Sequence, residues 1–251
     1  MSSLFTIPSM LLTSTAWPFG IFSEDKPAHP LLAQSKDYFD RLDKDRPLKD
    51  YEFVVLDTEL TGLNVKKDEI VSMGAVRIRA MRIDVESSFY FCASPTRDIP
   101  KISTLIHGIT PSEAQKAPPL EDALLEMLDY CGNAIIVGHH ISLDTGVLNR
   151  ELKKHFGGVL HNLCIDTMHL ARVYKEGHWT GSYEGYNMEF SYNLRNLSRE
   201  YGLPLFAEHN ALTDALQTAY LFLFLVHKLQ EDSVWTLKDL CRAGCTRRWG
   251  L

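Results

Sequence analysis

The segment EFVVLDTELTG at residues 52–62 constrains the fold more than any other stretch of this chain. Four apolar residues at 53–56 predict a buried strand over 52–57, and the acidic residues Asp57 and Glu59 stand at its end. Side chains of a strand alternate between its two faces, so these carboxylates point the same way. They repel each other unless a positive group lies between them. A simpler interpretation stays open here, in which Asp57 begins a turn and Glu59 is solvated.

The order of the predicted elements indicates the fold class. Three strand-like runs at 52–57, 69–79 and 83–92 follow one another through short connections, which predicts an antiparallel three-strand meander. Further along, strands alternate with helices. We expect a helix at 120–130, a strand at 134–139, a helix at 144–156, a strand end running into a helix over 164–174, and helices at 193–202, 210–229 and 236–244. This order is typical of an α/β domain whose mixed sheet, part antiparallel meander and part parallel strands, is flanked by helices.

Three regions are expected along the chain. Residues 1–46 form an N-terminal arm and a short amphipathic helix at 31–43, residues 47–230 form the main domain, and residues 231–251 form a last helix and a basic tail. The arm has no basic side chain before Lys26, so it lacks the charged region of a signal peptide. No apolar run approaches the ~20 residues of a spanning helix, and we expect no membrane partner.

The composition limits the kind of partner that the protein can bind. Its net charge of −6 argues against broad electrostatic binding to duplex nucleic acid. It leaves open an enzyme that holds a few phosphates through metal ions. Five scattered cysteines indicate free thiols in a reducing compartment, and we expect a cytoplasmic location.

Two more carboxylates and a histidine stand where functional groups gather in α/β folds. Asp144 follows the predicted strand at 134–139 and begins a helix, where it also suits the role of a plain N-cap. Asp214 lies in the first turns of an apolar helix, where burial without a partner would be costly. His209 lies five residues before Asp214. A lone histidine in such a position is more often a surface residue than a catalyst.

Four carboxylates that converge on one point require cations. Ligands made only of oxygen suit Mg²⁺ or Mn²⁺. Two such ions about 3.5–4 Å apart form a clamp for in-line attack on phosphorus. We therefore expect two divalent metal ions, Mg²⁺ or Mn²⁺, and Asp57 and Glu59 would share a face because a metal ion lies between them.

Three segments resemble the three motifs of the DEDDh (DnaQ-like) 3′→5′ exonucleases. DTELTG resembles the family's Asp-x-Glu-Thr-x-Gly motif, GHHISLD its His-Asn-x-x-Phe-Asp motif, and HNALTDA its His-x-Ala-x-x-Asp-Ala motif. The segments LIHGIT at 105–110 and IDTMHLAR at 165–172 are also similar to family segments. The likeness covers roughly residues 50–228. It implies a ribonuclease-H-like fold and makes residues 47–230 an exonuclease domain.

The resemblance implies a role for each member of the set. Asp57 would contact both ions, Glu59 and Asp214 would complete the shell of the first ion, and Asp144 would hold the second. His209 would be the general base that takes a proton from the attacking water. His139 is expected to be structural. The expected substrate contacts are Thr58, Leu60, Thr61, Gly62, Leu63, His107, His140 and Leu143.

Three positions depart from the usual motifs of the family. Leu60 stands where Thr is common, His140 replaces the common Asn, and Leu143 replaces the common Phe. These changes affect the expected substrate preference and leave the metal ligands unchanged. Leu63 is expected to contact the terminal base, with a core position as the alternative.

The implied activity is the release of nucleoside 5′-monophosphates from the 3′ ends of single-stranded DNA or RNA, with DNA favoured. A second hypothesis is a proofreading subunit that docks on a DNA polymerase or another replication or repair protein. The N-terminal arm or the tail with Arg242, Arg247 and Arg248 could form that contact. An RNA-trimming exoribonuclease and a non-catalytic nucleic-acid-binding module complete the set of hypotheses. The binding module is disfavoured because all four carboxylates and the histidine are present.

Overall fold

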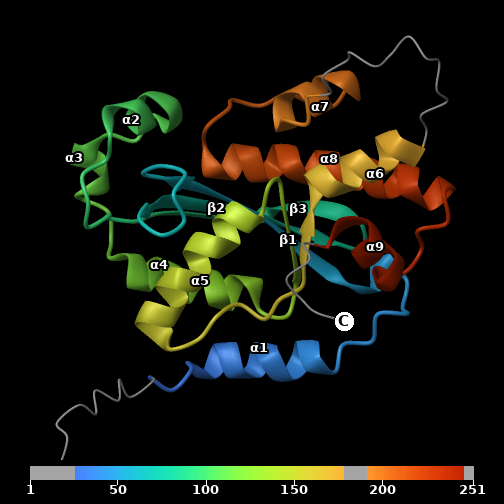
Figure 1. Ribbon diagram of the computed structural model, residues 1–251, viewed down its shortest axis with the longest axis horizontal. Coiled ribbons are helices and arrows are strands. Elements are labelled where there is room, and N and C mark those ends of the chain that lie inside the picture. The colour runs from blue at the N-terminus through green and yellow to red at the C-terminus, as the bar shows by residue number, and fades with distance from the viewer. Residues whose placement is uncertain (1–25, 178–190, 246–251) are drawn as a thin grey trace, which may run out of the picture.

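The fold is a five-stranded mixed sheet between two layers of helices, here taken from a computed structural model that describes residues 26–177 and 191–245 (Figure 1). The strand order is β3-β2-β1-β4-β5. The strands are β1 (Glu52–Leu60), β2 (Ile70–Arg79), β3 (Arg82–Cys92), β4 (Ile135–Gly138) and β5 (Cys164–Asp166). The α-helices are α1 (Pro30–Asp40), α2 (Lys101–His107), α3 (Pro111–Ala114), α4 (Leu120–Cys131), α5 (Ser142–Phe156), α6 (Thr167–Gly177), α7 (Leu194–Glu200), α8 (Ala211–Glu231) and α9 (Leu237–Gly244).

The predicted meander and the mixed sheet are both confirmed. β1 pairs antiparallel with β2, and β2 pairs antiparallel with β3. Ala80 and Met81 join β2 to β3 with positive φ values of 49° and 59°. Two left-handed residues in a row are the conformation of a tight hairpin turn, which twists in the same sense as the strands it connects. β4 and β5 then extend the sheet in parallel from β1.

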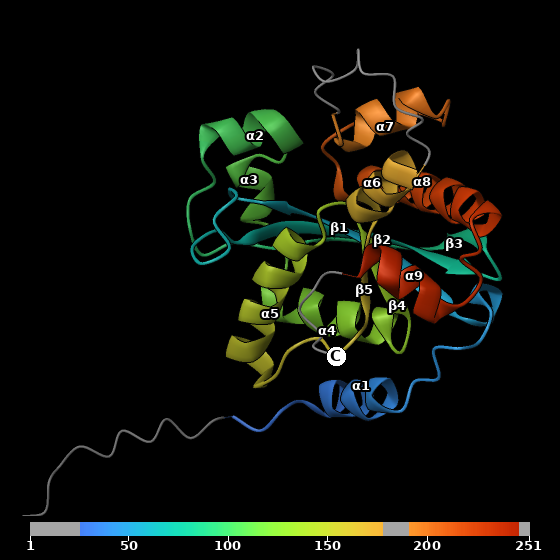
Figure 2. The same ribbon diagram turned by 45° about the vertical axis from the view of Figure 1, so that its right-hand side comes forward.

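The apolar run in β1 is explained by burial on both faces of the sheet. Val54 and Leu56 belong to the cluster under α4 and α5, whereas Phe53 and Val55 belong to the cluster under α6, α8 and α9. These helices cover the two faces as separate layers (Figure 2). The alternation continues along the strand, so Asp57 lies on the same face as Phe53 and Val55 and points toward α8.

Several elements differ from those predicted. β1 runs on to Leu60, so Asp57 and Glu59 lie within the strand and not at its end. β2 continues opposite both residues, and this pairing holds the backbone extended. The first helix ends at Asp40 instead of residue 43. The helices α2 and α3 were not predicted, although Pro100 before α2 and Gly108 after it are common helix-boundary residues.

Gly74 of β2 allows the start of α8 to lie directly on the sheet. It pairs with Asp57, and a Cβ atom at this position would lie 2.2 Å from the backbone nitrogen of Leu212. No side chain fits in that space, since real Cβ atoms do not approach other atoms so closely. The missing side chain therefore places the first turn of α8, which carries Asp214, beside Asp57.

Two of the sequence predictions lie outside the described residues. They are the N-terminal arm up to residue 25 and the end of the basic tail with Arg247 and Arg248. Within the described ranges, no helix has the length and apolar character needed to cross a membrane.

Candidate active site

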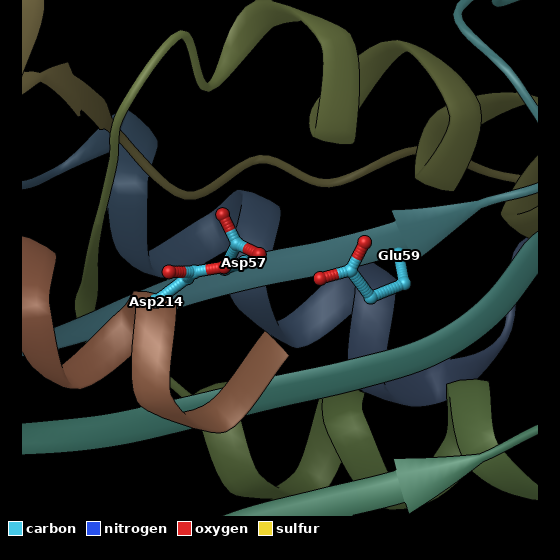
Figure 3. A group of neighbouring side chains, drawn as sticks. All are labelled: Asp57, Glu59 and Asp214. Carbon is cyan, nitrogen blue, oxygen red and sulfur yellow. The ribbon is translucent and has the colours of Figure 1, made fainter. Parts of the chain in front are cut away.

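Three carboxylates from two distant parts of the chain meet at the junction of β1 and α8. Each of Asp57, Glu59 and Asp214 contributes an oxygen, and these atoms all lie within 4.8 Å of one another. Figure 3 shows Asp57 and Glu59 on one face of β1, with Asp214 reaching toward Asp57 from α8. We refer to these three residues as the carboxylate cluster. The structure therefore brings together three of the four acidic residues picked out from the sequence.

Asp144 lies next to the carboxylate cluster and is held by β1. Its Oδ1 accepts a hydrogen bond from the backbone N–H of Thr58 at 3.0 Å and from the Thr58 hydroxyl at 2.6 Å. Its charge is close enough to raise the pKa of Asp57. Asp144 is not the N-cap of α5, since Ile141 holds that position without a side-chain cap. The N-cap interpretation is wrong. The hydroxyl of Thr58 contacts Asp144, and the expected contact of Thr58 with a substrate stays a prediction.

The electrostatics of the cluster are those of a site built for cations. Burial, and then the charges of Asp144, Asp214 and Glu59, raise the pKa of Asp57 well above its usual value. Burial and the charges of Asp214 and Asp144 raise the pKa of Glu59 to about 7. Burial also raises the pKa of Asp144 to about 7, and it raises the pKa of Asp214. Proximity of this kind is costly until a positive charge neutralises it.

The side-chain chemistry fits divalent metal ions. Within the described ranges, no hydrogen-bond donor reaches the carboxylate of Asp57 or Glu59, so their oxygens are available to a ligand. Oxygen ligands from carboxylates are those that Mg²⁺ and Mn²⁺ prefer. The residues present therefore fit such ions in the chemistry of their side chains.

His209 sits at the edge of the carboxylate cluster on a constrained backbone. Its backbone N–H donates to Oδ2 of Asp214 at 2.8 Å, and its side chain is exposed. Its φ of +62° lies in the left-handed region, which costs a residue other than glycine about 1–2 kcal/mol. Such strain is found where a site fixes the backbone for function. Asn210 follows as the N-cap of α8, with its side chain accepting from the backbone of Leu212 and Thr213.

The other three histidines of the motifs differ in their surroundings. Both ring nitrogens of His139 are engaged, one with the Thr167 hydroxyl and one with the carbonyl of Tyr192, each at 2.8 Å. Burial lowers the pKa of His139 to about 4, so the ring is neutral and structural. His107 is buried, its Nδ1 accepts from the Ile109 backbone, and its Nε2 has no partner in the described part of the chain. His140 is exposed, with a φ of +59°.

The loop after β1 contains buried and exposed members of the expected substrate set. Leu60 and Thr61 are 8% and 3% exposed, and the Thr61 hydroxyl is used by Asp68 and Glu69, so neither side chain faces a substrate. Contacts of these two residues with a substrate are therefore expected through the backbone, and they stay a prediction. Leu63 is 82% exposed, which excludes the core position considered for it.

The remaining two members of the expected set have restricted surroundings. Gly62 faces the Asp68 carboxylate too closely for any side chain, since an added Cβ would lie 2.6 Å from Asp68 Oδ2. Leu143 is half-buried at the start of α5, where it packs against the core under that helix.

An exposed apolar surface on α2 escaped the sequence reasoning. Ile102, Leu105 and Ile106 are exposed on this helix, and Leu105 is 81% exposed. The segment LIHGIT stands out in the sequence for its family likeness and not as a helix. The sequence signal for α2 is the pair of residues that flank it, Pro100 and Gly108. The apolar residues between them are of a kind that is usually buried in a helix.

A cavity of about 390 Å³ opens beside the carboxylate cluster. Asp57 and Asp214 line one part of it. Residues 193–195 at the start of α7 line much of the rest. The other lining residues are His139, Leu205, Phe206, Glu208, His209 and Gln217. Sequence reasoning did not single out the α7 residues, because they carry no motif of acidic or histidine residues.

A mixed sheet with a carboxylate cluster between its first strand and a late helix defines a ribonuclease-H-like nuclease. A profile of the exonuclease family (RNase_T) matches residues 54–222. The chain therefore belongs to this exonuclease family, of the DEDD type.

The curated relatives include much longer polymerases. The PolC-type DNA polymerase III of Staphylococcus haemolyticus is 29% identical over 197 residues, which cover 78% of this chain and 13% of that protein. The PolC-type enzyme of Thermotoga petrophila is 32% identical over 199 residues, which cover 79% of this chain and 14% of that protein. The chain thus spans only a small part of the length of these relatives.

The fold is also similar to solved exonuclease structures. Exonuclease X in complex with 5′ overhanging duplex DNA matches with a TM-score of 0.56 and 23% identity, over 76% of this chain and 98% of that chain. Exonuclease I of E. coli in complex with a dT13 oligonucleotide matches with a TM-score of 0.63 and 18% identity, over 73% of this chain and 42% of that chain. At these identities the likeness concerns the fold.

Proposed function

We propose that this protein is a metal-dependent 3′→5′ exonuclease that removes nucleoside 5′-monophosphates from the 3′ end of single-stranded DNA. The carboxylate cluster is the observation that carries the proposal, since three oxygens from Asp57, Glu59 and Asp214 lie within 4.8 Å of one another. Such a cluster is unfavourable by itself and becomes favourable when it holds cations. Membership of the exonuclease family supports the reaction type.

Two divalent ions, Mg²⁺ or Mn²⁺, fit the acidic residues of the site. Asp57, Glu59 and Asp214 would hold one ion, and Asp57 and Asp144 would hold the other. When bound, such ions activate the attacking water and stabilise the charge on the phosphate and on the leaving oxygen. Thr58 fixes the direction of Asp144 through its two hydrogen bonds, so it acts as a positioning residue in this scheme.

His209 is the residue proposed to move the proton. Its imidazole is exposed beside the carboxylate cluster and can accept the proton of the attacking water. Its backbone N–H keeps Asp214 in place at the same time, so the base and a metal ligand move as one unit. The exposed side chain of Leu63, in the loop after β1, offers an apolar surface for the terminal base.

DNA is favoured over RNA because the similar curated proteins are DNA polymerases. The same similarity makes proofreading beside a polymerase a second candidate role for this activity. The decisive contacts for sugar choice involve the 2′-OH, which a few atoms of the site can accept or exclude. The two activities, RNA trimming and DNA hydrolysis, are therefore distinguished by comparing DNA and RNA substrates directly.

The test uses single-stranded DNA and RNA of one sequence, each labelled at the 5′ end and supplied with Mg²⁺ or Mn²⁺. A 3′→5′ exonuclease shortens the labelled strand by one nucleotide at a time and releases nucleoside 5′-monophosphates, identified by chromatography. A strand blocked at its 3′ terminus should survive, whereas one blocked at its 5′ terminus should be shortened. Cuts within a circular single strand would contradict the assignment, and Asp214→Asn serves as the inactive control.

A further inference from the structure

The cavity beside the carboxylate cluster has the size and position of a nucleotide subsite. Its volume of about 390 Å³ falls within the range of about 300–1,000 Å³ of small-molecule sites. Asp57 and Asp214 line it, whereas Glu59 does not. Glu59 lies further along β1, toward the loop that carries Leu63. We therefore expect the cavity and Leu63 at different ends of the cluster. In both views α2 and α7 are set apart from each other above the sheet, with α7 next to α8 (Figures 1 and 2).

Most polar side chains that line the cavity are already engaged with protein groups. The Gln217 amide donates to Ser198 and Pro204 and accepts from the backbone of Phe206. Asn193 caps α7 through its side-chain oxygen, and His139 uses both ring nitrogens. Among the described lining residues, Arg195 is the one with a permanent positive charge. It is therefore the main candidate to contact a phosphate in the cavity.

Arg195 is held by an ion pair that a phosphate could replace. Its Nη1 lies 2.5 Å from Oε2 of Glu208, and the two side chains are 36% and 39% exposed. An ion pair with this exposure is weak, because water screens both charges. Arginine has five N–H donors in a planar fork that matches a phosphate, and the pair with Glu208 leaves most of them available.

We propose that Arg195 binds the phosphate on the 5′ side of the penultimate nucleotide, and that Glu208 competes with this phosphate for the guanidinium. The inference rests on the proposed function. With the terminal nucleotide at Leu63 and the scissile phosphate at the carboxylate cluster, the penultimate nucleotide falls in the cavity. Its own 5′ phosphate then lies toward the start of α7, where Arg195 is.

A pair of dinucleotides isolates this contact. A dinucleotide with a 5′ phosphate carries the group that Arg195 would bind, whereas the same dinucleotide without it carries only the scissile phosphate. The steady-state kinetics of both are measured with Mn²⁺ for wild type, Arg195→Gln, Glu208→Gln and Arg199→Gln. Arg199 is an exposed arginine of the same helix that does not line the cavity, so it is the matched control.

Wild type is expected to prefer the 5′-phosphorylated dinucleotide. Arg195→Gln should lower kcat/KM for that substrate by about 10- to 100-fold through KM, as for the loss of a charged hydrogen bond, and leave the other substrate unchanged. Glu208→Gln should lower KM for the phosphorylated substrate, because it frees the guanidinium. Arg199→Gln should have the kcat/KM of wild type on both dinucleotides.

Two results would overturn the inference while leaving the proposed function intact. One is an Arg195→Gln enzyme that retains the wild-type preference for the 5′ phosphate. The other is an equal loss of kcat/KM on both dinucleotides in Arg195→Gln and Glu208→Gln. That result would mean that the ion pair holds the segment with His209 in position. A wild-type enzyme that degrades neither the dinucleotides nor longer strands would instead overturn the proposed function, and the inference with it.

Discussion

Replacing Asp57 by Asn should stabilise the metal-free protein, because it removes a charge from a cluster with no counterion among the described residues. Oxygens of Glu59 and Asp214 lie within 4.8 Å of an Asp57 oxygen. At this distance and an effective dielectric constant of about 20, each like-charge pair costs about 3.5 kcal/mol. The Asn amide can also donate a hydrogen bond to a neighbouring carboxylate.

The net gain is smaller than the sum of these pairs. Water screens side chains that are partly exposed, and proton uptake relieves part of the repulsion, so about 2 kcal/mol is a reasonable net figure. For a domain of this size, that gain raises the melting temperature by about 4–8 °C. The substitution is therefore expected to stabilise the fold and to abolish activity.

The stability gained by Asp57→Asn should increase with pH. The folded-state pKa of Glu59 is raised to about 7, and that of Asp57 is also raised, so the folded protein binds more protons than the unfolded chain between about pH 4.5 and 7. The metal-free wild type therefore loses stability as the pH rises through this window. At pH 5 Glu59 is largely protonated, so Asp57 meets less negative charge and the gain from its replacement should be small there and reach its full size by pH 8.

The assay is thermal unfolding in EDTA and in Mn²⁺ at pH 5 and pH 8. Mn²⁺ should stabilise wild type more than the variant, because the ions need the carboxylate. Asp37→Asn on the exposed side of α1 is the matched control and should change little under any condition. A variant that is less stable than wild type in EDTA at pH 8, or a gain that is equal at both pH values, would refute this electrostatic account.

Three further outcomes are expected. Asp214→Ala should lower turnover by several orders of magnitude with the fold retained, and excess EDTA should do the same to wild type; activity that survives chelation would contradict metal dependence. His209→Ala should lower turnover about 10²–10⁴-fold and change KM little. The rise of rate with pH that we expect for wild type should shift or vanish in the variant, since only neutral imidazole accepts a proton. If the profiles of rate against pH of wild type and His209→Ala superimpose, His209 takes no part in the proton transfer. Gly74→Ala should move the start of α8, lower the melting temperature and weaken Mn²⁺ binding measured by calorimetry; tight binding at wild-type stability would show that α8 adapts without cost.

The sequence predicted the sheet and its clustered acids because both rest on local patterns. Residues 53–59 show the alternation and the apolar run of β1, and Asn210 before α8 is a common N-cap residue. Asp57 and Glu59 could be assigned to one face from the period of a strand alone. The approach of Asp214 could not, since it depends on Gly74 and on the packing of α8 across β1 and β2.

The parts that escaped prediction depend on contacts between distant segments. The hydroxyl of Thr58 turns to Asp144, 86 positions further along the chain. The pairing of Arg195 with Glu208 joins α7 to the segment before α8, and neither residue has a sequence pattern that indicates the other. The short helix α2 lacks the long apolar period on which helix prediction relies. Tertiary packing, and not local preference, decides these features.

The separation of Asp57 from Asp214 along the chain has a consequence for synthesis. A ribosome completes β1 long before it reaches α8, which carries the proposed metal ligand Asp214. The segment just before α8 carries the proposed base, His209. Until this helix has emerged and packed on Gly74, the nascent chain has an acidic strand that lacks its third ligand. The nascent chain is therefore expected to be unable to degrade nucleic acid until α8 has left the ribosome and packed on the sheet. Its activity would begin only after the last long helix is in place.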